Sequence, residues 1–165
     1  MKPQASPLNI IDFAIMDLQF KFIPPKENLE LDIKQYFNKY ELDIDFTITK
    51  NEIIQVFIKT EINRGKKVLP GYSIFAEIAC IFEFNKQIKI SDDAKMSIEG
   101  FSTIYIALNN LRGFISQVTA NGPVGRYILP SIDLNDLINK KKEILVMEDK
   151  KSKKVVNEQT AKKAK

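Results

Sequence analysis

The sequence predicts an α+β fold in which a four-stranded antiparallel sheet precedes two helices. The main observation is a change of hydrophobic period. Apolar residues alternate with polar ones in the first half of the chain and recur every three or four residues after residue 90. The length of 165 residues suits one domain, because two domains would each be too small to bury a core. We therefore expect a loose amino terminus over residues 1–7, a single domain over 8–147 and a disordered Lys-rich tail over 148–165.

Four segments have the period-two pattern that is typical of strands: residues 8–23, 41–49, 53–62 and 72–84. In the first, Leu18, Phe20 and Phe22 alternate with polar residues, which predicts one buried face. Pro24-Pro25 ends this strand, because proline has no N–H group for the ladder. The last segment is apolar on both faces, so we expect it at the centre of the sheet or at an interface.

The connection over residues 26–40 fits either a short helix or a long crossing loop. It ends with three aromatic residues, Tyr36, Phe37 and Tyr40, which are unusual in a poorly structured connection. Together with the strands that are apolar on more than one face, they give more apolar surface than one inner face of a two-layer fold needs. This surplus fits a larger core, an oligomer interface or an exposed binding surface.

The second half of the chain predicts two helices. The first spans roughly residues 94–120 and follows Ser91, which can cap it. Gly100 and Gly113 each weaken this helix by about 1 kcal/mol relative to Ala, so we expect a break near one of them. Asn121-Gly122-Pro123 ends the helix, with Gly122 suited to a left-handed cap. A short extended piece at 126–130 leads to the second helix at 133–147.

The composition argues against an enzyme. The chain has no His and a single Cys, Cys80, which excludes His-based catalysis, a Cys–His nucleophile and the usual Cys/His zinc sites. The glycines at 122–126 lack phosphate-loop spacing, and Asp43 with Asp45 fits the solvated face of a strand. Cys80 fits a small core residue, and a chain without an internal disulfide fits a reducing compartment. We expect no catalytic residue, no cofactor and no metal.

The positive charge of the chain is concentrated in its tail. Residues 140–165 contain ten Lys and four acidic residues, a net charge of +6, whereas residues 1–139 carry −2. The basic pI therefore says little about the body, and no nucleic-acid partner is expected. A solubilising tail is the favoured interpretation over one that binds nucleic acid, an anionic surface or an acidic partner. No signal peptide or spanning helix is visible, so we expect a cytoplasmic protein without membrane insertion.

Residues 108–138 resemble SecB, the bacterial preprotein-export chaperone. In that family a helix containing an Arg leads through a Gly turn to a Leu-Pro pair, an acidic residue and a Leu-rich helix. The corresponding positions here are Arg112, Gly122, Leu129-Pro130, Asp133 and Leu137. Residues 17–25 (DLQFKFIPP) resemble the family's first strand and the Pro-containing crossover after it, and the likeness covers roughly residues 12–142.

The resemblance implies a SecB-like fold that assembles as a homotetramer, a dimer of dimers. It also implies an ATP-independent holdase that keeps unfolded client or precursor proteins soluble and competent for export. In the family, clients lie in apolar grooves formed by the crossover, the sheet edge and the helices. Here that implies client contacts from six residues: Tyr36, Phe37, Tyr40, Leu42, Ile44 and Phe46.

The resemblance also bears on partners other than clients. The family binds the SecA-type translocase motor through acidic residues, and Asp17 and Glu77 fall at matching positions. Lys21 replaces an acidic residue expected there, which weighs against motor docking. SecB-like proteins also occur beside toxin–antitoxin pairs, so the alternative function is a dedicated chaperone or adaptor for one partner such as an antitoxin.

Overall fold

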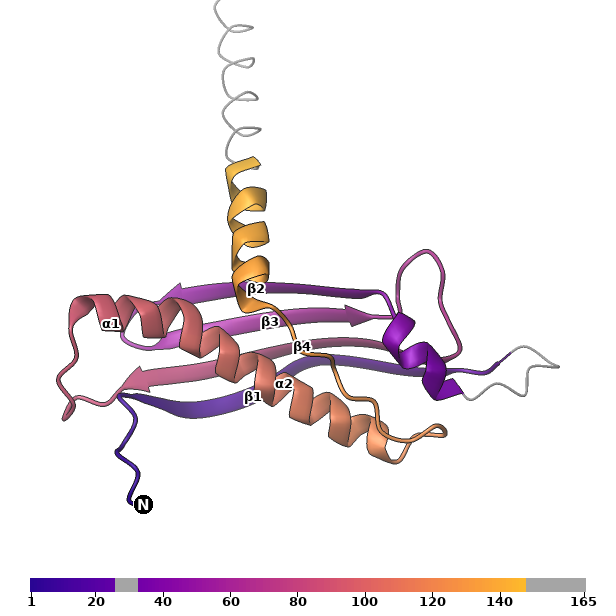
Figure 1. Ribbon diagram of the computed structural model, residues 1–165, viewed down its shortest axis with the longest axis horizontal. Helices are drawn as coiled ribbons and strands as arrows, with labels where there is room; N and C mark the ends of the chain where they lie inside the picture. The colour runs from indigo at the N-terminus through magenta and orange to yellow at the C-terminus, as the bar shows by residue number, and fades with distance from the viewer. Residues whose placement is uncertain (26–32, 148–165) are drawn as a thin grey trace, which may run out of the picture. The chain divides into compact units, whose positions relative to one another are not determined.

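The computed structural model describes residues 1–25 and 33–147, and the expected tail over 148–165 lies outside the described residues. Four strands form one antiparallel sheet in the order β1-β4-β3-β2 (Figure 1). Their bounds are Leu8–Ile23 for β1, Leu42–Lys50 for β2, Ile54–Ile62 for β3 and Gly71–Phe84 for β4. The predicted α+β fold is confirmed, and β4 lies between two neighbouring strands as its two-sided apolar pattern indicated.

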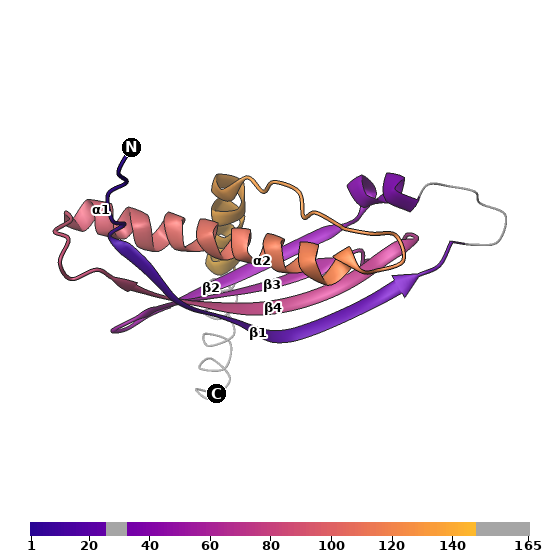
Figure 2. The ribbon, with the colours of Figure 1, turned by 90° about the horizontal axis from the view of Figure 1, so that it is seen from below.

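Three consecutive helical segments follow the sheet and cover one of its faces (Figure 2). They are α1 (Asp92–Ser97), the π-helical turn η2 (Ile98–Ser102) and α2 (Thr103–Ala120). Ser91 caps α1 by accepting a hydrogen bond from the backbone N–H of Ala94 at 3.3 Å. The expected irregularity falls at Gly100, inside η2, whereas α2 runs through Gly113 without a break.

The core lies between α2 and the two middle strands. We call the face that α2 covers the helix side of the sheet and the opposite face the outer face. Buried residues recur along α2 at the spacing of one helical face, and they meet the inward residues of β3 and β4. They include Ile104, Leu111 and Ile115 from the helix, with Ile58, Ile62, Tyr72, Ile74, Ile78 and Phe82 from the sheet.

Cys80 is fully buried on the helix side of β4, as predicted for a core residue. Burial raises the pKa of its thiol to about 11, and the charge of Asp12 acts in the same direction. Because the thiolate is the reactive form, we expect iodoacetamide to modify Cys80 about 100-fold more slowly in the native protein than in denaturant. Mass spectrometry at timed intervals measures both rates, and equal rates would show that β4 is accessible to the reagent.

The helix end differs from the prediction at one glycine. Gly122 does not have the positive φ of a left-handed cap; the positive-φ glycines of the described residues are Gly71 and Gly125. A Cβ atom at position 122 would lie 2.4 Å from the Tyr72 hydroxyl oxygen. The prediction of a left-handed cap was therefore wrong, and a side chain is excluded there by the close approach of a buried tyrosine.

Arg112 fastens the segment after α2 back onto the helix. Its Nε donates to the carbonyl oxygen of Leu129 at 2.9 Å, and its Nη2 donates to that of Pro130 at 2.9 Å. Nη1 also donates to the side chain of Asn109 at 3.0 Å. The extended piece at 126–130 thus has hydrogen-bond partners although it belongs to no strand.

The chain divides into two compact units, Met1–Pro130 and Ser131–Lys165. In the second unit, residues 134–147 form a helix whose first turn is capped by the Asp133 carboxylate. The expectation of a single domain over residues 8–147 stays a prediction. No helix among the described residues is long and apolar enough to cross a membrane.

Candidate functional site

Six aromatic rings gather at one end of the sheet, on its helix side, and we call them the aromatic cluster. The Phe37 ring lies 5.8 Å from that of Tyr72, 5.5 Å from that of Tyr40 and 5.3 Å from that of Tyr127. Phe20 and Phe22 of β1 complete the cluster, with ring centroids 5.1 Å and 6.4 Å from that of Tyr72. The cluster therefore joins β1, β4, the 3₁₀ helix η1 (Ile33–Lys39) and the segment that follows α2.

Hydrogen bonds fix the two central tyrosines of this cluster. The Tyr72 hydroxyl donates to the carbonyl oxygen of Gly125 at 2.8 Å and accepts from the N–H of Val124 at 3.2 Å. The Tyr40 hydroxyl donates to the carbonyl oxygen of Pro70 at 3.0 Å and accepts from the N–H of Tyr72 at 2.8 Å. Both rings are buried, so they hold the fold together at this end of the sheet.

The cluster predicts a loss of stability at high pH. Burial, with Tyr40 nearby, raises the pKa of Tyr127 to about 12, and burial also raises the pKa of Tyr40. A raised pKa favours the protonated form in the folded state, so this stabilisation is complete below pH 10 and is lost as the pH rises toward 12. We expect the free energy of unfolding to fall by about 2 kcal/mol in that interval. Urea unfolding as a function of pH measures the fall, and Tyr127→Phe should reduce it; an unchanged profile in that variant would contradict the assignment.

A row of apolar side chains on β1 is only half covered. Ile10, Ile15, Leu18 and Phe20, which we call the β1 strip, pair in register with Phe82, Ile78, Ala76 and Ile74 of β4. Those β4 residues are buried, whereas the β1 strip residues are 46%, 45%, 37% and 38% exposed. Because residues directly opposite each other share a face, the strip lies on the helix side of the sheet. The alternation of Leu18 and Phe20 predicted a buried face, but this face of β1 is only partly buried. The reason is that β1 is an edge strand and α2 packs on β3 and β4.

Two register shifts interrupt β1, between Ile10 and Asp12 and between Ile15 and Asp17. Each leaves one extra residue on β1, Ile11 and Met16, and both are exposed. Bulges of this kind increase the local twist of a strand and are common at sheet edges beside binding sites. They add two apolar side chains to the same exposed edge.

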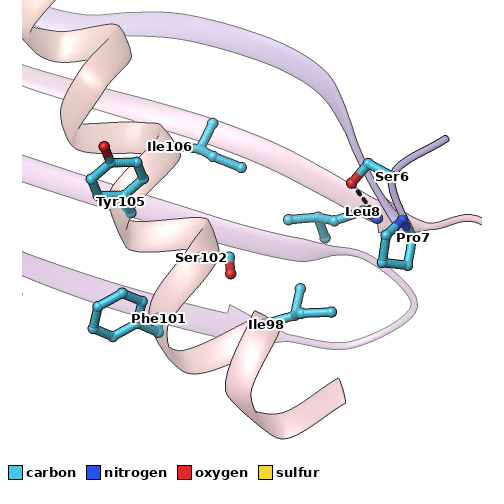
Figure 3. Close-up of a pocket in the computed structure, with 8 residues that line it drawn as sticks. All are labelled: Ser6, Pro7, Leu8, Ile98, Phe101, Ser102, Tyr105 and Ile106. Carbon is cyan, nitrogen blue, oxygen red and sulfur yellow. Dashed lines mark hydrogen bonds between the residues drawn. The ribbon is translucent and has the colours of Figure 1, made fainter. Parts of the chain in front are cut away.

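A hollow of about 330 Å³ lies between the start of β1 and the helical segments (Figure 3). Pro7 and Leu8 line it on the strand side, and Ile98, Phe101, Tyr105 and Ile106 line it on the helix side. The π-helical turn η2 contains Ile98 and Phe101. Phe101 and Tyr105 are exposed. The β1 strip therefore runs from this hollow to the aromatic cluster, over a strand length of about 33 Å.

No protein-family model matches the sequence, and no curated protein matches it. Among solved structures, the fold resembles that of Mycobacterium tuberculosis Rv1957, a SecB-like chaperone in complex with a ChAD peptide from the Rv1956 HigA1 antitoxin. The two chains superpose with a TM-score of 0.53 and 12% sequence identity over 76% of this chain and 91% of that one. The chain has the SecB-like fold. A protein of unknown function from Streptococcus agalactiae is also similar, with a TM-score of 0.42, 9% identity and coverage of 78% of this chain and 100% of that one.

The SecB-like resemblance assigned client binding to six residues, which the structure places on the helix side of the sheet. Tyr36 and Phe37 lie on η1 and are half-buried, and Tyr40 follows η1 and is buried. The other three lie on β2: Leu42 and Ile44 are half-buried and Phe46 is buried. The connection thus contains a 3₁₀ helix at its end, while residues 26–32 lie outside the described residues. A role of these six residues in client binding stays a prediction.

The structure brings together the two residues at the motor-contact positions of the SecB family. Asp17 of β1 and Glu77 of β4 are directly opposite each other on the outer face of the sheet. Like charges in this arrangement destabilise a sheet slightly, although Glu77 also faces Lys59 of β3. Lys21 lies on the same outer face, opposite Ser73. A motor contact at this mixed-charge surface stays a prediction.

The chemistry available at the β1 strip is that of a binding surface. Among the described residues, no three His, Cys, Asp or Glu side chains gather as metal ligands. The strip instead offers apolar side chains along an edge strand, whose outer N–H and C=O groups face no further strand of the described chain. Apolar contact along the face of a strand, without a shaped pocket, suits an extended peptide of unspecified sequence.

Proposed function

We propose that this SecB-like chain is an ATP-independent holdase that binds extended apolar segments of unfolded proteins along the β1 strip. The observation that carries the proposal is the row of half-exposed apolar side chains that joins the hollow to the aromatic cluster. Each side chain leaves under half of its surface for a client, so each contact contributes roughly 1 kcal/mol or less. Several weak contacts along one client give useful affinity without a shaped pocket.

The proposed role of the six predicted residues follows from their burial. Tyr40 and Phe46 are buried, so we assign them a structural role beneath the binding surface. Tyr36, Phe37, Leu42 and Ile44 are half-buried and have area left for a client. In our proposal the surface therefore includes η1, which meets β1 at the aromatic cluster. Leu42 and Ile44 lie on β2 at the opposite edge of the sheet and would form a second patch.

We propose a homotetramer, as in the SecB family. The long edge of β1 suits pairing with β1 of a second copy, because such pairing uses main-chain groups and leaves both faces of the strand open. The β1 strips of two copies would then lie side by side on one continuous sheet and double the apolar area available to a client. We infer action in the cytoplasm, where the single buried thiol of Cys80 stays reduced.

The test is light scattering as a chemically unfolded protein is diluted into buffer without ATP. We expect suppression of aggregation at about one tetramer per client, because one client can occupy several strips. Light scattering coupled to size exclusion should give a native mass near four chains of 18.9 kDa. A folded and oligomeric protein that does not suppress aggregation would overturn the holdase proposal.

A second candidate function is a dedicated chaperone for one partner, such as an antitoxin. The observation in its favour is that Rv1957, which shares the fold, was solved with an antitoxin peptide. The two functions differ in selectivity rather than in the surface used. Binding measured against a panel of unrelated unfolded proteins separates them: a general holdase binds most of the panel, and a dedicated chaperone binds none of it.

A further inference from the structure

The outer face of the sheet has a basic corner beside the turn between β3 and β4. A hollow of about 620 Å³ lies there, at the edge of the sheet. It is lined by Leu18, Gln19, Phe20 and Lys21 of β1, Ser73 of β4, and Arg64 and Val68 of the turn. Lys66 and Lys67 are the neighbouring residues of the turn and are exposed. Four cations, Lys21, Arg64, Lys66 and Lys67, thus belong to one corner of the molecule, which we call the basic corner.

The turn that presents these cations is held in place by Asn63. This residue is buried and has a φ of 55°, a left-handed conformation that asparagine tolerates. Its side-chain N–H groups donate to the carbonyl oxygens of Leu69 and Tyr72, and its side-chain oxygen accepts from the N–H of Leu69, all at 2.8 Å. The residues between 63 and 69 therefore form a loop closed at its base.

Arg64 is exposed, and two contacts position its side chain. Its Nη1 donates to the side-chain oxygen of Gln19 at 3.0 Å, and its guanidinium lies 5.4 Å from the ring centre of Phe75. The ammonium of Lys59 lies over the same ring at 5.4 Å. The hollow consequently has a fixed planar cation on its wall, a group well suited to binding carboxylates.

The described residues neutralise the charge of the basic corner only in part. Among the described residues, none of its four cations has a carboxylate oxygen within 4.0 Å. The acidic groups nearby are otherwise engaged: Asp17 accepts a hydrogen bond from Gln19 at 3.3 Å, and Glu61 pairs with Lys59 at 3.6 Å. Glu41 lies against Gly65 within the turn and offsets part of the positive charge.

We propose that the basic corner is a docking site for an acidic peptide segment that also carries small apolar side chains. The carboxylates would meet Lys21, Arg64 and the turn lysines, and an apolar side chain would enter the hollow against Val68. A nucleic acid fits less well, because residues 1–139 carry a net charge of −2. The hollow adjoins the β1 strip, because Leu18 and Phe20 also line it. The proposal rests instead on the cations of the outer face and the turn, which the holdase proposal does not use.

The test uses the full chain and two fluorescent peptides: one that alternates Glu with Leu and Val, and a matched peptide with Gln in place of Glu. Fluorescence anisotropy should show about tenfold tighter binding of the Glu peptide, with a difference that shrinks as salt is added. The Lys66→Ala/Lys67→Ala double variant should lose most of this preference. Lys86→Ala/Lys89→Ala, which removes the same charge from exposed positions between β4 and α1, should keep it.

Equal binding of the two peptides, or an equal loss in both double variants, would overturn the proposal. A single-stranded oligonucleotide that binds with the same dependence on Lys66 and Lys67, while the Glu peptide does not bind, would replace the peptide with a nucleic acid and also overturn it. The holdase function is measured separately by suppression of aggregation. Failure of either proposal is therefore distinguishable from failure of the other.

Discussion

An Ile15→Asp/Leu18→Asp double variant is expected to bind unfolded clients about 10- to 100-fold more weakly than the natural chain. Both side chains belong to the β1 strip and are exposed enough to be substituted without opening the core. The change removes apolar contact area and forces a client to desolvate two carboxylates, which together weaken binding by about 2 kcal/mol. Fluorescence anisotropy with a labelled, permanently unfolded client measures the dissociation constant.

The matched control is Thr47→Asp/Thr49→Asp. These residues are exposed on the outer face of β2, so the control adds the same charge at similar strand positions. It should bind clients as the natural chain does. If both double variants lose affinity equally, net charge rather than the β1 strip determines client binding, and the assignment of the site is wrong.

Tyr72→Ala is expected to be the most destabilising single change at the aromatic cluster, with a loss of about 3–5 kcal/mol in the free energy of unfolding. Its ring contacts Phe20, Phe22 and Phe37, and its hydroxyl holds the backbone at Val124 and Gly125. Truncation leaves a cavity where four segments of the chain meet. Urea unfolding followed by circular dichroism measures the loss.

Two further variants separate the packing of Tyr72 from its hydrogen bonds. Tyr72→Phe keeps the ring and removes the hydroxyl, so we expect a loss of about 1–3 kcal/mol from two backbone groups left without their partner. Tyr105→Phe removes an exposed hydroxyl and should change stability by less than about 0.5 kcal/mol. If Tyr72→Phe is as stable as the natural chain, the hydroxyl bonds at 2.8 Å and 3.2 Å contribute nothing to stability.

The fold was predictable because its signals are local. Alternation in the strands and the three- and four-residue spacing around Leu108, Leu111 and Ile115 each depend on neighbours in sequence. The bounds predicted for the four strands agree with the structure to within one residue at each end. The cap at Ser91 was predictable for the same reason. The role of Gly122 was not predictable, because the side chain that leaves no room for a Cβ atom there is Tyr72, fifty residues earlier in the chain.

The candidate site was only partly predictable, because exposure depends on the order of strands. The pattern of Leu18 and Phe20 is the same whether β1 lies at the centre or at the edge of the sheet. In the structure β1 is an edge strand that pairs only with β4 among the described strands, and this position leaves the two side chains half-exposed. The sequence indicated the aromatic residues of the 26–40 connection as unusual. It did not indicate their partners Tyr72 and Tyr127, because these lie far away in sequence. The basic corner likewise depends on a turn folding beside β1, which no local pattern indicates.

The most direct test of the proposed function is site-specific photo-crosslinking to an unfolded client. A photoreactive phenylalanine analogue replaces Ile15 on the β1 strip or, as the control, Thr47 on the outer face of β2. We predict that position 15 crosslinks to the client in the absence of ATP and that position 47 does not. Crosslinks from position 15 only to a second copy of the chain, or equal client crosslinks from both positions, would contradict the proposal that the β1 strip holds clients.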